Sequence, residues 1–433
     1  MDTPLHRTWP EMTWPEIARL HVFDPEGDVI LILERTLEDD LEVPAPASPL
    51  SLDIPDWPEP EPDLDPPEAS QPVVVSDWPE AEPESLRYES QPETTGVSGG
   101  LTKPETSTST YSVRQESKPN VEKVQMRVSS KHLILASPTF RTSLGSGTYP
   151  EGRTLQSEGH LVIPLPDDDP DVMIILMNII HGHSSEVPRR LDLSMLSKIA
   201  IAVNHRRMHE AVGIWSETWI ENLKRDEGLP SSYTPDAVLS WLFIFWVFRE
   251  AEGFRNMSGI LVRESDGSLE NEVEAAYIGP HVPVSIIKNI QKDRIDLIES
   301  MIAVIHDLIT KYSGRDILCK QGNAFSCDAN LLGSLMKASA IIGIWPRPED
   351  PYPGISAKML ASQIREMDVL DDCIRIGRGH YRSGSNHGIR ALIEASIDSL
   401  EVRVPGLPLK SFLLKASGEG EKVRKANEAS QIR

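Results

Sequence analysis

The sequence predicts a mixed α+β protein, in which a cluster of helices carries a small sheet at one edge and an α-helical C-terminal region follows. Three observations predict this class. Short apolar runs at 28–33, 124–128 and 161–166 are bounded by Gly, Pro and polar residues, as strands are. Beyond residue 129, apolar residues recur mostly at helical spacing. The stretch 38–119 follows neither pattern and is rich in Pro, Glu, Ser and Thr, a composition that predicts a long disordered insertion.

The stretch VSSKHLILASPTFRTSL, at 128–144, predicts two short helices. The Ser-Ser pair at 129–130 can cap the first helix, because a Ser hydroxyl accepts a free first-turn N–H. Ser137-Pro138 ends that helix and opens the next one, since Pro suits a first helical position. Phe140 and Leu144 are four residues apart and so lie on one face. We therefore expect a tight helical hairpin with an apolar seam.

A strand over 161–166 precedes a helix that we expect over 171–181. Asp169 is a suitable N-cap for this helix and Pro170 a suitable first residue. The helix is nearly all apolar (VMIILMNII), so we expect it to be buried on most sides. Gly182 can end it.

This order of elements resembles the BTB/POZ domain, in the form found in many proteins of filamentous fungi. The segments that match are GDVILIL (27–33), MRVSSKHLILASPTF (126–140), LVIPLPDDDPDVMIILMNIIHG (161–182) and LSKIAIAVNHRRMHEAVGIWSETWIENL (196–223). The resemblance implies a protein-interaction fold without catalytic residues. It also implies that the strands at 28–33 and 124–128 form one hairpin, although the insertion lies between them.

These patterns divide the chain into five expected parts. They are an N-terminal segment (1–22), a BTB/POZ domain (23–37 and 120–224) split by the disordered acidic Pro-rich insertion (38–119), an α-helical region (225–403) and a flexible tail (404–433). Within the α-helical region, apolar periodicity predicts helices over 235–252, 283–313, 330–344, 355–369 and 389–400.

The net charge is −23 and the isoelectric point is near 5.0. Between 38 and 93 there are seventeen acidic residues and one arginine, so most of the charge lies in the insertion. Such a balance argues against a general binder of nucleic acid or of acidic membranes. The basic stretch RIGRGHYRSGSNHGIR at 375–390 could contact phosphate, but we interpret it as a mobile surface loop and do not expect nucleic acid as a partner.

Three cysteines give no disulfide framework and fit a reducing compartment. The N-terminus lacks the apolar region of a secretory signal. The longest apolar run, around 241–248, is far shorter than a membrane span of about 20 residues. We therefore expect an intracellular protein of the cytoplasm or nucleus, neither secreted nor bound to a membrane.

Two patterns bear on chemistry. Gly96-Val97-Ser98-Gly99-Gly100 matches the G-x-S-x-G string of serine hydrolases, but both its flanks are polar low-complexity sequence rather than the strand and helix which that motif needs. We therefore predict that the chain is not an enzyme and has no catalytic residues.

The other pattern contains Cys319, Cys327, Cys373, His380 and His387, which could be assembled into a zinc site. Their spacings are not the short C-x2–4-C of structural zinc sites, which favours buried thiols and a His-containing surface loop instead. We expect no metal and no cofactor, and we keep a metal- or nucleic-acid-binding helical region as the remote alternative.

Candidate partner-binding residues are Tyr149 and Glu151, in the sequence Tyr-Pro-Glu that follows the predicted helical hairpin. BTB proteins that recruit cullin-type ubiquitin-ligase scaffolds carry a hydrophobic–x–acidic triplet at this place, which we expect to be a mobile loop. Trp57 and Trp78, each in a Trp-Pro-Glu repeat, are candidate linear motifs. The leading hypothesis is a non-enzymatic protein that self-associates or docks a protein partner. A substrate adaptor for a cullin-based ubiquitin ligase is the alternative.

Overall fold

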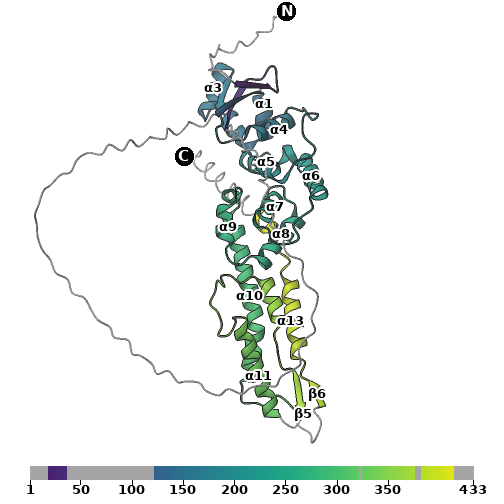
Figure 1. Cartoon of the computed structure of the whole chain (residues 1–433). Helices are drawn as coiled ribbons and strands as arrows, with labels where there is room; N and C mark the ends of the chain where they lie inside the picture. The colour runs from purple at the N-terminus through teal and green to yellow at the C-terminus, as the bar shows by residue number, and fades with distance from the viewer. Residues whose placement is uncertain (1–17, 37–120, 321–323, 376–381, 414–433) are drawn as a thin grey trace, which may run out of the picture. The chain divides into compact units, whose positions relative to one another are not determined.

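The structure is a computed structural model that describes residues 18–36, 121–320, 324–375 and 382–413 (Figure 1). The predicted insertion 38–119, with Trp57 and Trp78, lies outside these residues. Strands are β1 (Ala18–Val22), β2 (Val29–Thr36), β3 (Val121–Val128), β4 (Leu161–Pro164), β5 (Asp372–Arg375) and β6 (Arg382–Asn386). Helices are α1 (Ser130–Ala136), α2 (Pro138–Leu144), α3 (Pro150–Glu158), α4 (Pro170–Ile180), α5 (Leu193–Arg206), α6 (His209–Asp226), α7 (Pro235–Val247), α8 (Ala251–Glu264), α9 (Leu269–Ala275), η1 (Gly279–His281), α10 (Val284–Tyr312), α11 (Ala324–Ile341), α12 (Ala357–Arg365) and α13 (Ile389–Arg403). The mixed α+β class predicted from sequence is confirmed.

The first sheet has the strand order β1-β3-β2-β4. Strands β2 and β3 pair antiparallel from Val29↔Val128 to Thr36↔Val121, so they form one hairpin across the insertion. Strand β4 lies parallel to β2. Strand β1 lies parallel to β3, so residues 18–22 of the predicted N-terminal segment (1–22) belong to the sheet, while 1–17 lie outside the described residues.

Helix α1 is capped differently from the sequence prediction. The Ser129 side chain makes no capping hydrogen bond. Instead, the Asp28 carboxylate accepts hydrogen bonds from the Ser130 backbone N–H and hydroxyl, both at 2.7 Å. Asp28 immediately precedes β2, so the hairpin brings in a cap from 102 residues earlier in the chain.

The predicted helical hairpin is present as α1 and α2. The Ser137 hydroxyl accepts the Phe140 N–H at 3.1 Å and donates to the Arg206 carbonyl at 2.5 Å, which ties the turn to the end of α5. Phe140 is buried, with the Arg206 guanidinium 5.3 Å above its ring. That guanidinium also forms an ion pair with Asp168, in the turn before α4. One arginine therefore connects the hairpin, α5 and the approach to α4.

Helix α4 is buried on most of its surface, as its composition predicts. The Asp169 carboxylate accepts the N–H groups of Asp171 and Val172, so this expected N-cap is confirmed. The helix packs against α5 and α6, and α5 packs in turn against α7. The apolar core therefore continues past the predicted boundary at 224/225.

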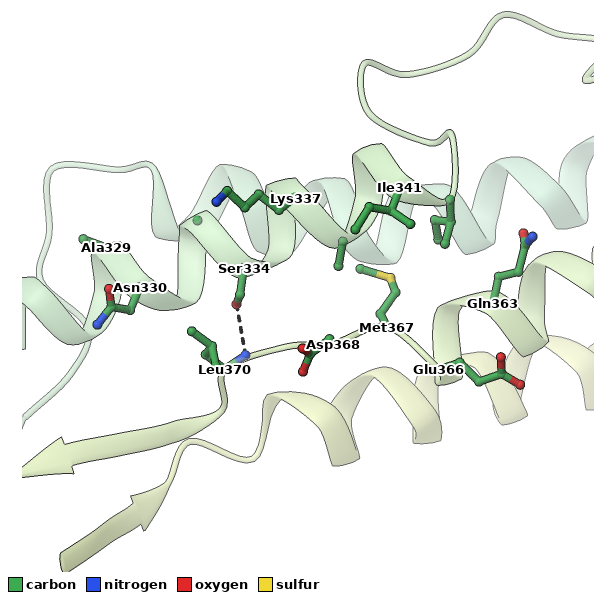
Figure 2. A pocket seen from close by; sticks show the side chains of 13 residues that line it. Ala329, Asn330, Ser334, Lys337, Ile341, Gln363, Glu366, Met367, Asp368 and Leu370 are labelled. Atoms are coloured by element: carbon green, nitrogen blue, oxygen red, sulfur yellow. Dashed lines mark hydrogen bonds between the residues drawn. The ribbon is translucent and has the colours of Figure 1, made fainter. Parts of the chain in front are cut away.

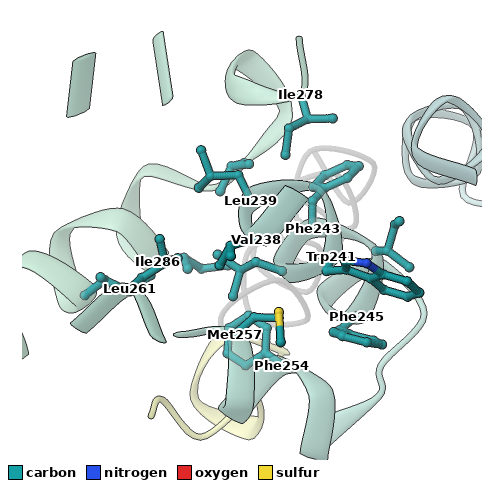
Figure 3. Close-up of a cluster of buried hydrophobic side chains, with 14 of the residues drawn as sticks. Val238, Leu239, Trp241, Phe243, Phe245, Phe254, Met257, Leu261, Ile278 and Ile286 are labelled. Carbon is teal, nitrogen blue, oxygen red and sulfur yellow. The ribbon is translucent and has the colours of Figure 1, made fainter. Parts of the chain in front are cut away.

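Helix α7 is the most apolar helix of the core (Figure 3). Trp241 and Phe245 stack on one side of it at 5.0 Å between ring centroids. The predicted single helix over 235–252 ends earlier, because Arg249 adopts a left-handed conformation and Glu250 caps a new helix, α8, through the Gly253 N–H. Helices α8 and α9 were not predicted from the sequence.

The long helix predicted over 283–313 is confirmed as α10, which contacts α8, α9, α11, α12 and α13. The predicted tail begins too early. Leu407 and Leu409 are buried, and the Phe412 ring lies 5.8 Å from that of Phe254 in α8. Gly406, at φ 109°, allows this approach, because a Cβ there would lie 1.9 Å from the Arg255 carbonyl oxygen. Within the described residues, no helix combines the length and the apolar character needed to cross a membrane.

Candidate functional site

The main candidate site is a cluster of Cys319, Cys327, Cys373 and His387. One ligand atom from each residue, a thiol sulfur or an imidazole nitrogen, lies within 4.8 Å of all the others. The Cys319 and Cys373 sulfurs are 3.6 Å apart, and the Cys327 sulfur is 2.9 Å from the His387 Nε2. Soft sulfur and imidazole ligands in this number are those of structural zinc sites. We call these four residues the Cys3His cluster.

Three segments of the chain meet in the Cys3His cluster. Cys319 lies in the link after α10, Cys327 lies in the first turn of α11, and the β5–β6 hairpin provides the other two residues. Cys373 is in β5, and His387 directly follows β6. The hairpin lies beside the start of α11 (Figure 1).

Two buried carboxylates hold the backbone on either side of the cluster. Asp328 accepts hydrogen bonds from the N–H groups of Leu318 and Cys319, at 2.6 and 3.1 Å. Asp371 accepts hydrogen bonds from the N–H groups of Ile389 and Arg390, at 3.0 and 3.2 Å. Both carboxylates therefore bind backbone N–H groups next to the cluster.

Asp371 fixes His387 as well, because its carbonyl accepts the His387 N–H at 3.0 Å. Burial, followed by the neighbouring Cys373 and Cys319 thiols, raises the pKa of Cys327 to about 12. Thiols packed together in this way release protons readily only when a cation is supplied, since the thiolate is the form that binds metal.

The ligand spacing in the sequence argued against a zinc site. The fold brings together four of the five residues that it named, and the fifth, His380, lies outside the described residues. The predicted surface loop at 375–390 contains β6 and the start of α13. The sequence signal was weak because the residues in contact are far apart in the chain: 54 residues separate Cys319 from Cys373, and 60 separate Cys327 from His387.

A groove of about 670 Å³ runs beside α11 (Figure 2). Ile341, Met367 and Leu370 give it apolar walls, and Lys337 and Glu366 bring charge to it. The Ser334 hydroxyl within it accepts the Leu370 N–H at 3.0 Å and donates to the Leu331 carbonyl at 2.9 Å. That hydroxyl therefore holds α11 to the segment before β5, which is a structural role.

The Tyr149-Pro150-Glu151 sequence is not the mobile loop that we expected. Tyr149 is the N-cap of α3, Pro150 is its first residue, and Glu151 lies in its first turn. The signals for this helix were present in the sequence, since Pro at the first position, an acidic first turn and Gly159 at the end are typical of helices.

Tyr149 lines a cleft of about 490 Å³ beside α2. Its side chain is exposed, while Glu151 is half-buried. His205 and Arg207, at the end of α5, also line this cleft. The position therefore presents an aromatic ring next to basic groups.

The other sequence candidates, Gly96–Gly100, Trp57 and Trp78, lie outside the described residues. In comparisons with family models, with curated proteins and with solved structures, nothing matched this chain.

Proposed function

We propose that the chain is a non-enzymatic protein-interaction protein that acts through a BTB/POZ domain formed by residues 23–37 and 120–224. The observation that supports the proposal is the connectivity of this part. A β2–β3 hairpin leads into the α1–α2 helical hairpin, and β4 then joins the sheet parallel to β2 before the buried helix α4. This is the order that the sequence resemblance implies.

Strand β1 favours self-association. It lies at the edge of the sheet, next to β3 only. Leu20 and Val22 are two residues apart and both exposed, at 52% and 48%, so they place apolar side chains on one face of that edge strand. Edge strands offer unpaired N–H and C=O groups to another chain.

Sedimentation velocity on the full chain over a micromolar concentration range tests self-association. We expect a concentration-dependent dimer that the double substitution Leu20→Lys, Val22→Lys converts to monomer. Ile214→Lys is the matched control, because Ile214 is 81% exposed on α6, and it should leave the dimer intact. A wild-type chain that stays monomeric would contradict self-association.

A second candidate function, adaptor for a cullin-type scaffold, is favoured by the exposed Tyr149 beside its cleft. Aromatic side chains that fill a partner pocket carry much of the binding energy in such interfaces. Glu151, two residues further along α3, would orient the partner more than strengthen its binding.

Calorimetric titration of the chain with a purified cullin N-terminal domain tests this function. Tyr149→Ala should weaken binding about thirtyfold, which corresponds to about 2 kcal/mol, without changing thermal stability. Ile214→Ala should bind as the wild type does. Absence of binding by the wild type at micromolar concentrations would remove the adaptor function and leave self-association as the proposal.

A further inference from the structure

We propose that the Cys3His cluster binds one Zn²⁺ ion as a structural site, with the Cys319, Cys327 and Cys373 thiolates and the His387 imidazole as its four ligands. This inference is independent of the proposed interaction domain, because the ligands all lie beyond residue 224.

The distances suit a tetrahedral ion. Zn–S bonds of about 2.3 Å place two sulfurs of a tetrahedron about 3.8 Å apart. The Cys319–Cys373 pair is already at 3.6 Å, and no pair in the cluster exceeds 4.8 Å. Tetrahedral ligation would shorten the longest distances in the cluster by about 1 Å and lengthen the 2.9 Å Cys327–His387 contact.

The ligand backbones are fixed before any ion binds. Asp328 holds the Cys319 segment through two backbone N–H groups, and Asp371 holds His387 and the start of α13. Groups that orient metal ligands from outside are a regular feature of metal sites. Here the two buried carboxylates are occupied by backbone donors, which leaves the softer sulfur and nitrogen atoms to face one another.

A zinc ion would also stabilise the β5–β6 hairpin by linking it to the rest of the chain. Its strands read DCIR and RSGSN and form a sheet of their own. An isolated two-stranded hairpin is marginally stable in water, and Ser, Gly and Asn have low strand propensity. Cys319 and Cys373 are buried here but do not belong to the main apolar cluster of the described residues. Zinc would join the hairpin to α11 where apolar packing does not.

The ligand set favours Zn²⁺ over other ions. Thiolate with imidazole in tetrahedral geometry is typical of zinc, whereas Mg²⁺ and Ca²⁺ take oxygen ligands. Four protein ligands leave no open position for water, so the site is structural rather than catalytic. A Cys319–Cys373 disulfide is the competing arrangement, since these sulfurs are neighbours.

The test begins with the purified full chain, kept in reductant and dialysed against metal-free buffer. We expect elemental analysis to find one zinc per chain. After chelation and addition of Co²⁺, the visible spectrum should show tetrahedral cobalt with thiolate charge-transfer bands. This measurement needs no variant, so it stands even if a substituted chain fails to fold.

Variants then assign the ligands. Cys327→Ser should weaken zinc affinity by at least about a hundredfold, because even outer contacts of a metal site cost 10–100-fold. Cys327→His should retain zinc, since imidazole can replace a thiolate ligand. His387→Ala should lose zinc, whereas His281→Ala, at an exposed histidine of η1, should keep the wild-type content.

Two results would overturn the proposal. One is a folded, reduced wild-type chain that takes up neither Zn²⁺ nor Co²⁺ with thiolate bands. The other is mass-spectrometric detection of a Cys319–Cys373 disulfide in chain isolated under thiol-blocking conditions, together with wild-type zinc content in Cys327→Ser.

Discussion

Arg294 is a charged side chain placed entirely inside the fold. It extends from α10, and its guanidinium donates to the backbone carbonyls of Ser265, Pro351, Tyr352 and Ile355 at 2.6–3.0 Å. Burial of an arginine is costly unless its donors are satisfied, and here one planar fork binds two separate loops. Arg294 thus holds the link after α8 and the segment before α12 to the central helix.

We predict that Arg294→Ala lowers the free energy of unfolding by about 3–5 kcal/mol, because it leaves buried carbonyls without donors. Arg294→Lys should also be destabilising, since an ammonium lacks the planar fork. Urea titration measures both. Lys292→Ala, at an exposed position of the same helix, should change stability by no more than about 0.5 kcal/mol. A wild-type urea midpoint for Arg294→Ala would contradict this role.

His181 is held neutral by its contacts. Its Nε2 accepts the Ser129 N–H at 3.1 Å, and its Nδ1 lies 2.9 Å from the Met177 carbonyl and so carries the proton. Burial lowers the pKa of His181 below its usual 6.5, and the charge of His132, whose ring lies 4.7 Å away, acts in the same direction. Protonation of Nε2 would place two donors against each other at the entry to α1.

A pH dependence follows from this lowered pKa. Below about pH 6.5 the unfolded chain binds a proton at His181 that the folded chain does not. Stability should therefore be full above pH 6.5 and fall as the pH drops toward the folded pKa. Urea titrations between pH 7.5 and 5 should show a smaller decline in the free energy of unfolding for His181→Gln than for the wild type. Equal declines in wild type and His181→Gln would contradict the assignment.

Among the elements, the β2–β3 hairpin is the least usual, because its strands are joined through residues 37–120. Thr36 and Val121 are paired in register, so the strand ends on either side of the insertion are neighbours in the sheet. A short turn could therefore replace the insertion without moving either strand.

We predict that replacing 38–119 by Asn-Gly keeps the fold and raises the free energy of unfolding by up to about 2–3 kcal/mol. The gain comes from the lower entropy cost of closing a short loop, and Asn-Gly suits a hairpin turn. Thermal and urea unfolding of both chains provide the comparison. A shortened chain that is less stable or insoluble would show that the insertion contributes to the fold.

For the molecule as a whole, the contact of α5 with α7 joins the helices before residue 225 to those after it. The sheet and α1–α6 share an apolar core with the helices after residue 225. A continuous core predicts one cooperative transition rather than two independent ones.

Ile175→Asp tests this prediction. Ile175 is buried on α4, where an unpaired carboxylate has no compensating partner, so we expect a loss of more than about 4 kcal/mol or failure to fold. If the variant folds, calorimetry should show a single unfolding transition, shifted as a whole to lower temperature. Ile214→Asp, at a position 81% exposed, should melt as the wild type does. A second transition left at the wild-type temperature would contradict the shared core.

The sequence alone determined the features that depend on neighbouring residues. Apolar patterns placed α4, α7 and α10, and local chemistry placed the N-cap at Asp169 and the start of α2 at Pro138. The β2–β3 hairpin was predicted from its apolar strands and the family resemblance, despite the insertion. These predictions held because helix and strand patterns can be recognised within one continuous stretch of about 4–18 residues.

Only the tertiary structure decided the contacts between distant segments. Asp28 caps α1, Arg294 binds the carbonyls of two loops, and the Cys3His cluster assembles from three segments. None of these has a local signal, because each depends on which backbone groups burial leaves unpaired and which segments packing makes adjacent. The start predicted for the flexible tail, residue 404, was wrong for the same reason: Leu407 and Leu409 are buried, and the Leu407 N–H binds the Ser258 hydroxyl of the distant helix α8.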